Sequence, residues 1–282
     1  MVLVSALNGV LGGVGKHRYS FMPEAEFESL VRVDPPKASQ IYWLEILYRA
    51  HFSALTALVR SSRWIRGVLA AYREPNLLAF AASYRGLIEA AADTQDAFGL
   101  AAPTIAEYFG IIRTAVEGRA TVFHIVDRLE DTLIHFMHAR RLQKGEDAPP
   151  SHKAKDTRDY LAVLKRGCGD QVITCYAELC NLTHPAGPSV LAFAREHDGG
   201  SLIEYWPTAD RNRVGEFCSR YKTVASEILM FGINNALVML KLLNRFSHHA
   251  IRTPVMEQVD LSQIPSWVKV EKRAAESDPG PK

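Results

Sequence analysis

A long helical repeat of apolar residues constrains the fold of this chain more than any other feature. Ser39 supplies an N-cap, and Pro75 lies beyond the last apolar residue, so the sequence predicts a helix from Ser39 to about Tyr72. The serine pair Ser61 and Ser62 marks the place where this helix would break. The residues that recur at helical intervals are Ile41, Leu44, Ile46, Leu47, Leu55, Leu58, Ile65, Val68 and Leu69.

The rest of the chain repeats this pattern and shows one β signature. Helical periodicity predicts further helices at 76–98, 103–141 with a kink or turn at Gly118, 157–165, a segment around Tyr176, and 210–244. Two short alternating segments flank His197–Gly200, which is typical of a hairpin within 190–206. The sequence therefore predicts an all-α antiparallel helical bundle with a small β-hairpin before the last long helix.

We expect one bundle domain at 39–250, with a loop at 143–155, between an irregular leader at 1–38 and a polar tail at 251–282. We expect this tail to be partly disordered, from about Lys272 onward.

The leader contains the glycine-rich run Gly9–Lys16. A phosphate loop requires Gly, four residues, then Gly-Lys-Ser or Gly-Lys-Thr, whereas here Val10 stands five before Gly15 and His17 follows the lysine. This run is therefore interpreted as a flexible leader.

Composition predicts a cytoplasmic protein without a cofactor. The 33 basic and 31 acidic residues give a net charge of +2, which is no strong field for nucleic acid or anionic lipid. The N-terminus lacks the basic start of a signal peptide. The apolar stretch within 210–244 is long enough to cross a membrane, but it carries Glu227 and Lys241 and is better explained as a core helix, so no membrane contact is expected.

Four cysteines are interpreted as free thiols in a reducing compartment: Cys168, Cys175, Cys180 and Cys218. Their spacing matches neither a zinc ribbon nor a small disulfide scaffold. Cys180 and His184 would supply only two metal ligands from their helix, and no spacing supports further ligands on the helix of Glu89. We therefore expect no bound metal.

The candidate catalytic residues are His184, Arg85, Glu89 and Tyr176. Arg85 and Glu89 are four apart on one helix, either as a surface ion pair or as part of a buried network that meets another helix. His184 precedes Pro185, so it lies at or just past the last turn of its helix. A histidine there either caps the last carbonyls or transfers a proton, with Tyr176 two turns earlier on the same face.

Some helical-bundle nucleases carry an arginine and a histidine separated by four to six residues on one helix. Arg119 with His124 and Arg128 with His135 match this spacing. Random placement of the arginines and histidines of this chain would produce about two such matches. A structural role is therefore preferred for both pairs.

The segments YRGLIEAAADT and YAELCNLTHP, together with the hairpin that follows them, resemble uncharacterised bacterial proteins related to the HEPN (higher eukaryotes and prokaryotes nucleotide-binding) superfamily. The resemblance covers roughly residues 39–244. It implies an all-α bundle, often a homodimer, in a phage-defence or toxin-antitoxin system, with metal-independent RNA cleavage. In the nuclease members an arginine precedes the histidine on its helix, whereas Glu178 and Leu179 stand before His184 here. Arg85 would have to substitute from the neighbouring helix.

Two functions are consistent with these features. The first is an RNA-binding or RNA-cleaving protein in which His184 is the acid or base and Arg85 stabilises phosphate charge. The second is a catalytically inert helical module that binds a protein partner or dimerises.

Overall fold

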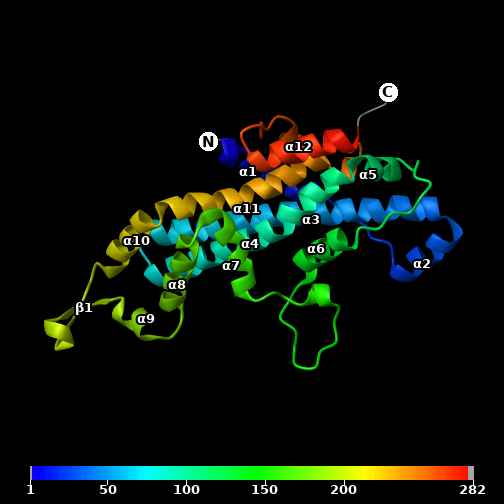
Figure 1. Cartoon of the computed structure of the whole chain (residues 1–282). Coiled ribbons are helices and arrows are strands. Elements are labelled where there is room, and N and C mark those ends of the chain that lie inside the picture. Colours follow the sequence, from blue (N-terminus) through cyan, green and yellow to red (C-terminus); the bar gives the residue numbers. More distant parts are fainter. Residues whose placement is uncertain (1, 279–282) are drawn as a thin grey trace. The chain divides into compact units, whose positions relative to one another are not determined.

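The computed structural model describes residues 2–278, and this part of the chain is all-α apart from one hairpin (Figure 1). Its first six α-helices are α1 (Val2–Gly13), α2 (Glu24–Val33), α3 (Pro35–Arg73), α4 (Leu77–Glu107), α5 (Phe109–Val116) and α6 (Asp127–His138). The others are α7 (Thr157–Cys168), α8 (Gln171–Thr183), α9 (Gly187–Leu191), α10 (Ala209–Arg220), α11 (Lys222–Leu243) and α12 (Pro265–Ser277). The strands are β1 (Ala194–His197) and β2 (Leu202–Tyr205). The predicted all-α class with a hairpin before the last long helices is confirmed.

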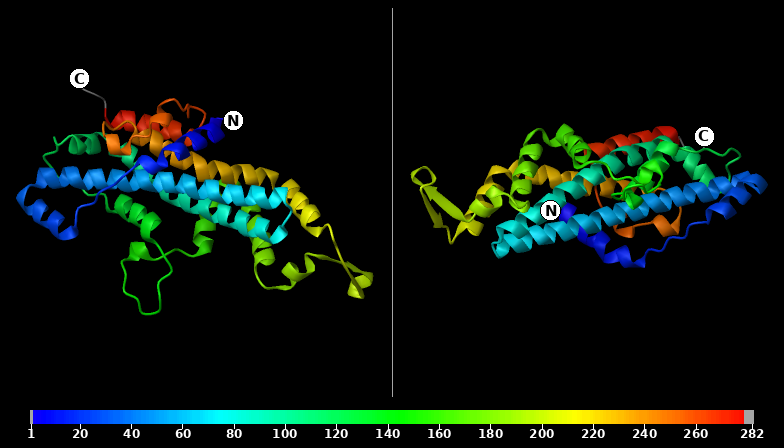
Figure 2. Two further views of the ribbon diagram at one scale, coloured as in Figure 1. Left: turned by 180° about the vertical axis from the view of Figure 1, so that it is seen from behind. Right: turned by 90° about the horizontal axis from the view of Figure 1, so that it is seen from below.

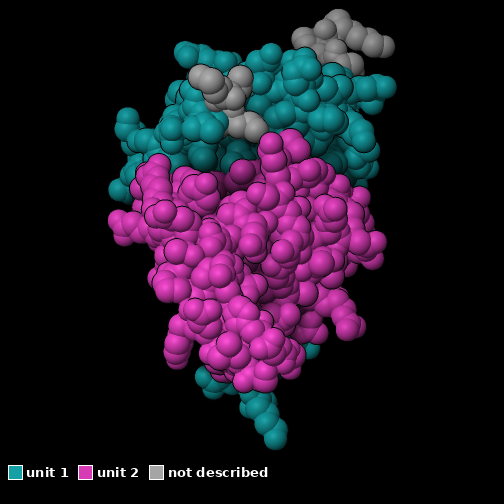
Figure 3. Space-filling view, turned by 90° about the vertical axis from the view of Figure 1, so that its left-hand side faces the viewer, with its two compact units in different colours: residues 1–58, 96–155, 233–282 teal, residues 59–95, 156–232 magenta. Residues whose placement is uncertain are grey.

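The chain divides into two compact units, coloured separately in Figure 3. Unit 1 comprises Met1–Leu58, Asp96–Lys155 and Ile233–Lys282, and unit 2 comprises Val59–Gln95 and Asp156–Gly232. Both units therefore contain segments that are far apart in the sequence. Their boundaries differ from the expected division at residues 38 and 250.

In unit 2 the end of α3 and the start of α4 pack closely and antiparallel. Arg60 forms an ion pair with Asp93 at 2.6 Å, while Trp64, one turn later on α3, lies against Gly86, two turns earlier on α4. A Cβ atom on Gly86 would stand 2.6 Å from the Trp64 ring, so only glycine permits this approach. The core of unit 2 adds apolar residues of α7, α8, α10 and α11, among them Leu164, Leu179, Phe217 and Ile228.

Unit 1 is held together by aromatic and polar contacts between segments distant in the chain. Phe109 of α5 packs on Phe246, with ring centroids 4.4 Å apart. Arg113 of α5 pairs at 2.6 Å with Asp278, which directly follows α12. Several large side chains here are almost completely buried, including Trp43, Phe98, Ile105, Ile112 and Leu129. Ile251, Met256 and Trp267 are buried as well, so the segment after residue 250 belongs to the core of this unit.

The expected irregular leader is wrong, because α1 and α2 form there and α3 already begins at Pro35. Proline is compatible with the first turn of a helix, so Pro35 and Pro36 start α3 rather than interrupt the chain. The expected break at Ser61 and Ser62 is also wrong. α3 is continuous from Pro35 to Arg73 (Figure 2), and the buried Ser61 hydroxyl donates a hydrogen bond to the carbonyl oxygen of Gly232.

The helix predicted from Pro103 to Arg141 is replaced by three separate helices. α4 continues through Pro103 to Glu107, and α5 ends at a Schellman motif in which Gly118 has φ +72°. There the amides of Gly118 and Arg119 donate to the carbonyls of Ala115 and Thr114. Residues 117–126 are not helical, and α6 begins only at Asp127.

The tail and the hairpin are both ordered. α12 continues through the predicted start of disorder at Lys272 to Ser277, because Trp267, Val270 and Ala274 bury one face of it. The predicted disorder of residues 279–282 lies outside the described residues. β1 and β2 pair antiparallel, with Ala194 opposite Tyr205 and His197 opposite Leu202.

One helix in the described part of the chain, α11, is long and apolar enough to cross a membrane. More than half of its apolar window, 56%, is buried inside the protein. The core helix of a globular protein passes the same test of length and composition.

Candidate active site

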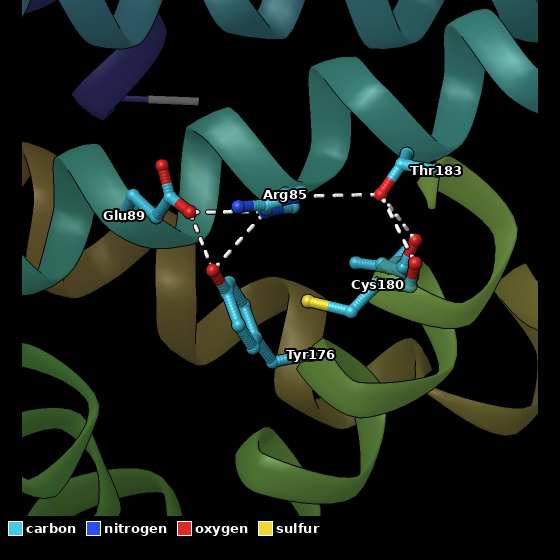
Figure 4. A network of polar contacts seen from close by, with 6 residues as sticks. Arg85, Glu89, Tyr176, Cys180 and Thr183 are labelled. Carbon is cyan, nitrogen blue, oxygen red and sulfur yellow. Dashed lines mark hydrogen bonds and ion pairs between the residues drawn. The ribbon is translucent and has the colours of Figure 1, made fainter. Parts of the chain in front are cut away.

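The candidate site lies in unit 2, where the middle of α4 faces the second half of α8. Arg85 and Glu89 are one turn apart on α4, and Tyr176 projects from α8 toward both of them (Figure 4). The surrounding residues of α4 are small or apolar, and Gly86, Leu87, Ile88 and Ala90 are all buried. The polar side chains of Arg85 and Glu89 therefore stand out from an otherwise apolar stretch of α4.

Three side chains form a closed set of hydrogen bonds. The Arg85 Nε–H donates to Glu89 Oε1 at 3.0 Å and to the Tyr176 hydroxyl at 3.1 Å. The Tyr176 hydroxyl donates in turn to the same Glu89 oxygen at 2.5 Å. We call Arg85, Glu89, Tyr176 and Thr183 the Arg85 network (Figure 4). Because each of the first three side chains contacts the other two, the guanidinium is held in one orientation.

Thr183 extends this network to the end of α8. Arg85 Nη1 donates to Thr183 Oγ1 at 3.4 Å, and the threonine hydroxyl donates to the carbonyl of Leu179 at 3.0 Å. Thr183 is not among the four site residues predicted from the sequence. Its position directly before His184, on the last turn of α8, is the sequence feature that could have indicated it.

The protonation states within the network follow from burial and bonding. Burial, and then the bond to Glu89, raises the pKa of Tyr176 well above that of a free phenol. Partial burial lowers the pKa of Arg85, but the bonds to Tyr176 and Glu89 outweigh this effect and leave the pKa above its usual value. Tyr176 is therefore a neutral donor and Arg85 a fixed cation at neutral pH.

His184 lies at the predicted place, directly after the last residue of α8. Its backbone is extended (φ −89°, ψ 151°), as the following Pro185 requires, and its amide donates to the carbonyl of Cys180 at 2.9 Å. The side chain is exposed and makes no hydrogen bond or ion pair with a described residue. The structure therefore brings Arg85, Glu89 and Tyr176 together. It leaves the imidazole of His184 exposed to solvent, one residue beyond Thr183.

The two arginine–histidine pairs lie in unit 1. Arg119 and His124 are in the non-helical segment 117–126, where Arg119 pairs with Glu117, so they do not share a helix. Arg128 and His135 are both on α6, but His135 Nδ1 lies 3.0 Å from the carbonyl oxygen of Ser151. This contact joins α6 to the loop at 143–155, as expected of a structural residue.

Glu178 lies on α8, six residues before His184, and is bonded to Tyr221, the residue between α10 and α11. Its carboxylate accepts hydrogen bonds from Arg220 Nη1 and from the Tyr221 hydroxyl, both at 2.8 Å. Glu178, Asn181, Arg213 and Arg220 help to line a cavity of about 270 Å³ in unit 2. Among the described residues, the lining does not include the four predicted site residues.

All four cysteines are free and lie in unit 2. Burial raises the pKa of Cys168 to about 11 and that of Cys175 to about 12, so both stay as thiols at neutral pH. No group of three or more His, Cys, Asp and Glu side chains in the described residues is arranged to hold a metal ion.

Comparison of the chain with family models, curated proteins and solved structures finds no match. The resemblance to the HEPN superfamily therefore stays a prediction.

Proposed function

We propose that this chain is a HEPN-like helical protein that binds RNA and cleaves it without a metal ion. Its setting would be the cytoplasm of a bacterium, as a homodimeric component of a defence or toxin-antitoxin system. The observation that supports this proposal is the hydrogen bond from Arg85 to Thr183, the residue directly before His184. An arginine of α4 thereby reaches the end of α8, where this chain lacks the arginine that the nuclease members carry before their histidine.

In the proposed reaction, His184 accepts the proton of a ribose 2′-hydroxyl. The 2′-oxygen attacks the neighbouring phosphorus, the P–O5′ bond breaks, and water protonates the leaving oxygen, which yields a 2′,3′-cyclic phosphate and a 5′-hydroxyl. Arg85 stabilises the negative charge that builds up on the phosphate oxygens. Glu89 and Tyr176 are positioning residues, because they bond Arg85 through Nε and leave its Nη groups toward the end of α8.

The test is cleavage of single-stranded RNA by the purified chain in excess chelator. We expect His184→Ala and Arg85→Gln each to lower the rate at least a hundredfold, which is the usual size of a general acid–base or charge-stabilisation effect. His124→Ala and His135→Ala are matched controls, since each removes one histidine from unit 1, and both should cleave at the wild-type rate. Circular dichroism establishes that each variant is folded.

Two results would reject the proposal. One is the absence of cleavage by the wild-type chain on unstructured and hairpin RNAs. The other is a folded His184→Ala variant that cleaves as fast as the wild type.

A second candidate function is a module for dimerisation or protein binding, and the exposed hairpin favours it. Ile203 is 60% and Tyr205 87% exposed, and Leu202 is exposed beside them. Apolar side chains gathered on a short hairpin are typical of a contact surface. If this function is correct, Ile203→Ser with Tyr205→Ser should abolish dimers in sedimentation analysis, while His184→Ala should leave them unchanged.

A further inference from the structure

Unit 1 contains a cavity of about 590 Å³ that the proposed function does not use. It is lined by two segments, residues 9–18 at the end of α1 and residues 249–255 after α11. Its volume falls within the roughly 300–1,000 Å³ of typical small-molecule sites.

The lining of this cavity is strongly basic. Lys16, Arg18 and Arg252 line it together with two histidines, and the lining includes no carboxylate. Arg252 is paired through Nε with Glu257 at 2.7 Å, and Arg18 Nη1 donates to the carbonyls of Gly15 and His17. The amino group of Lys16 has no hydrogen bond or ion pair with a described residue. Arg252 thus already has a carboxylate partner, whereas Lys16 and Arg18 have none among the described residues, so their charges repel each other at the cavity unless an anion offsets them.

Glycines of α1 keep the cavity open. A Cβ atom on Gly9 would stand 2.7 Å from Val255 Cγ2, so this glycine is explained by the close approach of two segments. A Cβ atom on Gly12 or Gly13 would meet no atom within 4 Å. Glycine inside a helix costs about 0.5–1 kcal/mol relative to alanine. Since packing does not require these two glycines, their effect is to leave room along the cavity wall.

The opposite wall is held in place by buried hydrogen bonds. Thr253 lines the cavity, and its hydroxyl lies 2.8 Å from Nε2 of the buried His51. The Asn244 side chain bonds both the amide and the carbonyl of Thr253, at 2.7 and 2.8 Å. This wall of the cavity is therefore fixed before a ligand enters, which lowers the entropic cost of binding.

We propose that this cavity binds a small phosphorylated molecule, with its phosphate groups on Lys16, Arg18 and Arg252. Several guanidinium and ammonium donors suit the two charges and three oxygens of a phosphate better than the single charge of a carboxylate. The volume leaves space for an organic part of nucleotide size. The site differs from a phosphate loop, because side chains rather than loop amides supply the contacts and because the spacing of that motif is absent.

The proposal is tested by isothermal titration of the full chain with pyrophosphate and with ATP, in chelator at low ionic strength. We expect saturable binding that weakens as salt is added. Lys16→Gln with Arg18→Gln should lower the affinity at least tenfold. Lys269→Gln with Lys272→Gln is the matched control, because it removes the same charge from the exposed face of α12, and it should bind like the wild type.

Gly12→Leu is an independent variant that fills the cavity without changing its charge. Leucine favours the helix more than glycine does, so the melting temperature should not fall, while the affinity for ATP should drop at least tenfold. A weaker affinity in a more stable protein separates a blocked site from a damaged fold.

Two further titrations distinguish a small phosphorylated molecule from the phosphates of RNA or of a lipid headgroup. A ten-nucleotide RNA and phosphatidylcholine vesicles containing phosphatidylinositol phosphate are titrated under the same conditions. Binding of RNA or of vesicles without binding of pyrophosphate or ATP would overturn the proposal. So would wild-type affinity in the Lys16→Gln, Arg18→Gln variant. None of these results depends on RNA cleavage at His184.

Discussion

The Arg85 network of unit 2 and a second network around His51 in unit 1 both join distant parts of the chain, but they differ in charge and exposure. His51 is completely buried; Nδ1 lies 2.7 Å from the Tyr19 hydroxyl and Nε2 2.8 Å from that of Thr253. In the Arg85 network, by contrast, the side chain of Arg85 is 31% exposed and that of Glu89 is 41% exposed. The network around His51 is therefore neutral and centred on a buried ring, whereas the Arg85 network is charged and partly exposed to solvent.

This difference separates a structural role from a functional one. Burial, followed by the neighbouring His17, lowers the pKa of His51 to about 3, so the ring stays neutral and both of its nitrogens are used in holding the fold. Arg85 stays charged, and only part of its guanidinium is used in orienting it. A ligand can therefore reach Arg85 without displacing a buried residue, whereas His51 is inaccessible to one.

The largest effect on the free energy of unfolding is expected from removing the buried imidazole of His51. His51→Ala removes two hydrogen bonds, leaves the hydroxyls of Tyr19 and Thr253 unpaired, and opens a cavity, so it should lower the free energy of unfolding by about 3–5 kcal/mol. Chemical denaturation measures this change. Tyr19→Phe, which removes one of the two bonds, should cost about 1 kcal/mol. If His51→Ala lowered the free energy of unfolding by less than about 1 kcal/mol, the network around His51 would contribute no more to stability than the exposed Arg85 network.

The second prediction concerns pH. Because the folded pKa of His51 is about 3 and the ordinary value is 6.5, the unfolded chain binds a proton between these values while the folded chain does not. This group therefore stabilises the fold fully above pH 6.5, and that contribution is lost as the pH falls toward 3. The stability gap between wild type and His51→Gln should narrow by about 1.4 kcal/mol per pH unit between pH 6 and pH 4. Urea denaturation at three pH values measures the gap, and a constant gap would contradict the buried neutral ring.

The smallest effect on the free energy of unfolding is expected from substitutions in the Arg85 network. Glu89→Gln should cost about 0.5 kcal/mol at low salt, because the ion pair is partly exposed, and 0.5 M salt should remove most of that cost. Tyr176→Phe is the matched comparison, since it removes an uncharged hydroxyl that bonds Arg85 and Glu89 and leaves the Arg85–Glu89 ion pair in place. It should cost about 1 kcal/mol at either salt concentration. Equal salt dependence of the two variants would place Glu89 in the same buried environment as Tyr176.

Local patterns predicted the parts of the fold that depend on neighbouring residues. The apolar repeat from Ile41 to Leu69 predicted α3, and Pro185 predicted the end of α8 because proline restricts the residue before it. Distant contacts decided the parts that were missed. α4 continues through Pro103 because Ile105 and Ala106 are buried beyond it, and the leader is helical because α1 packs against the segment around Val255.

The candidate site shows the same limit. The spacing of four residues predicted that Arg85 and Glu89 would meet, and the structure adds the contact with Tyr176 of another helix. No periodicity could show that Arg85 also reaches Thr183, because that bond depends on how far α8 extends beside α4. The spacing of Arg119 and His124 carried little information, as expected of a chance match, since the left-handed Gly118 ends the helix before the pair begins.

The placement of the cysteines has a practical consequence for folding experiments. The chain has four cysteines, all within unit 2, and the thiols of Cys168 and Cys175 are buried and protonated. An alkylating reagent should modify these two thiols only when unit 2 opens, while unit 1 contributes no signal. Mass spectrometry of timed labelling would thus follow the opening of one half of the molecule with a reporter that the native sequence already carries.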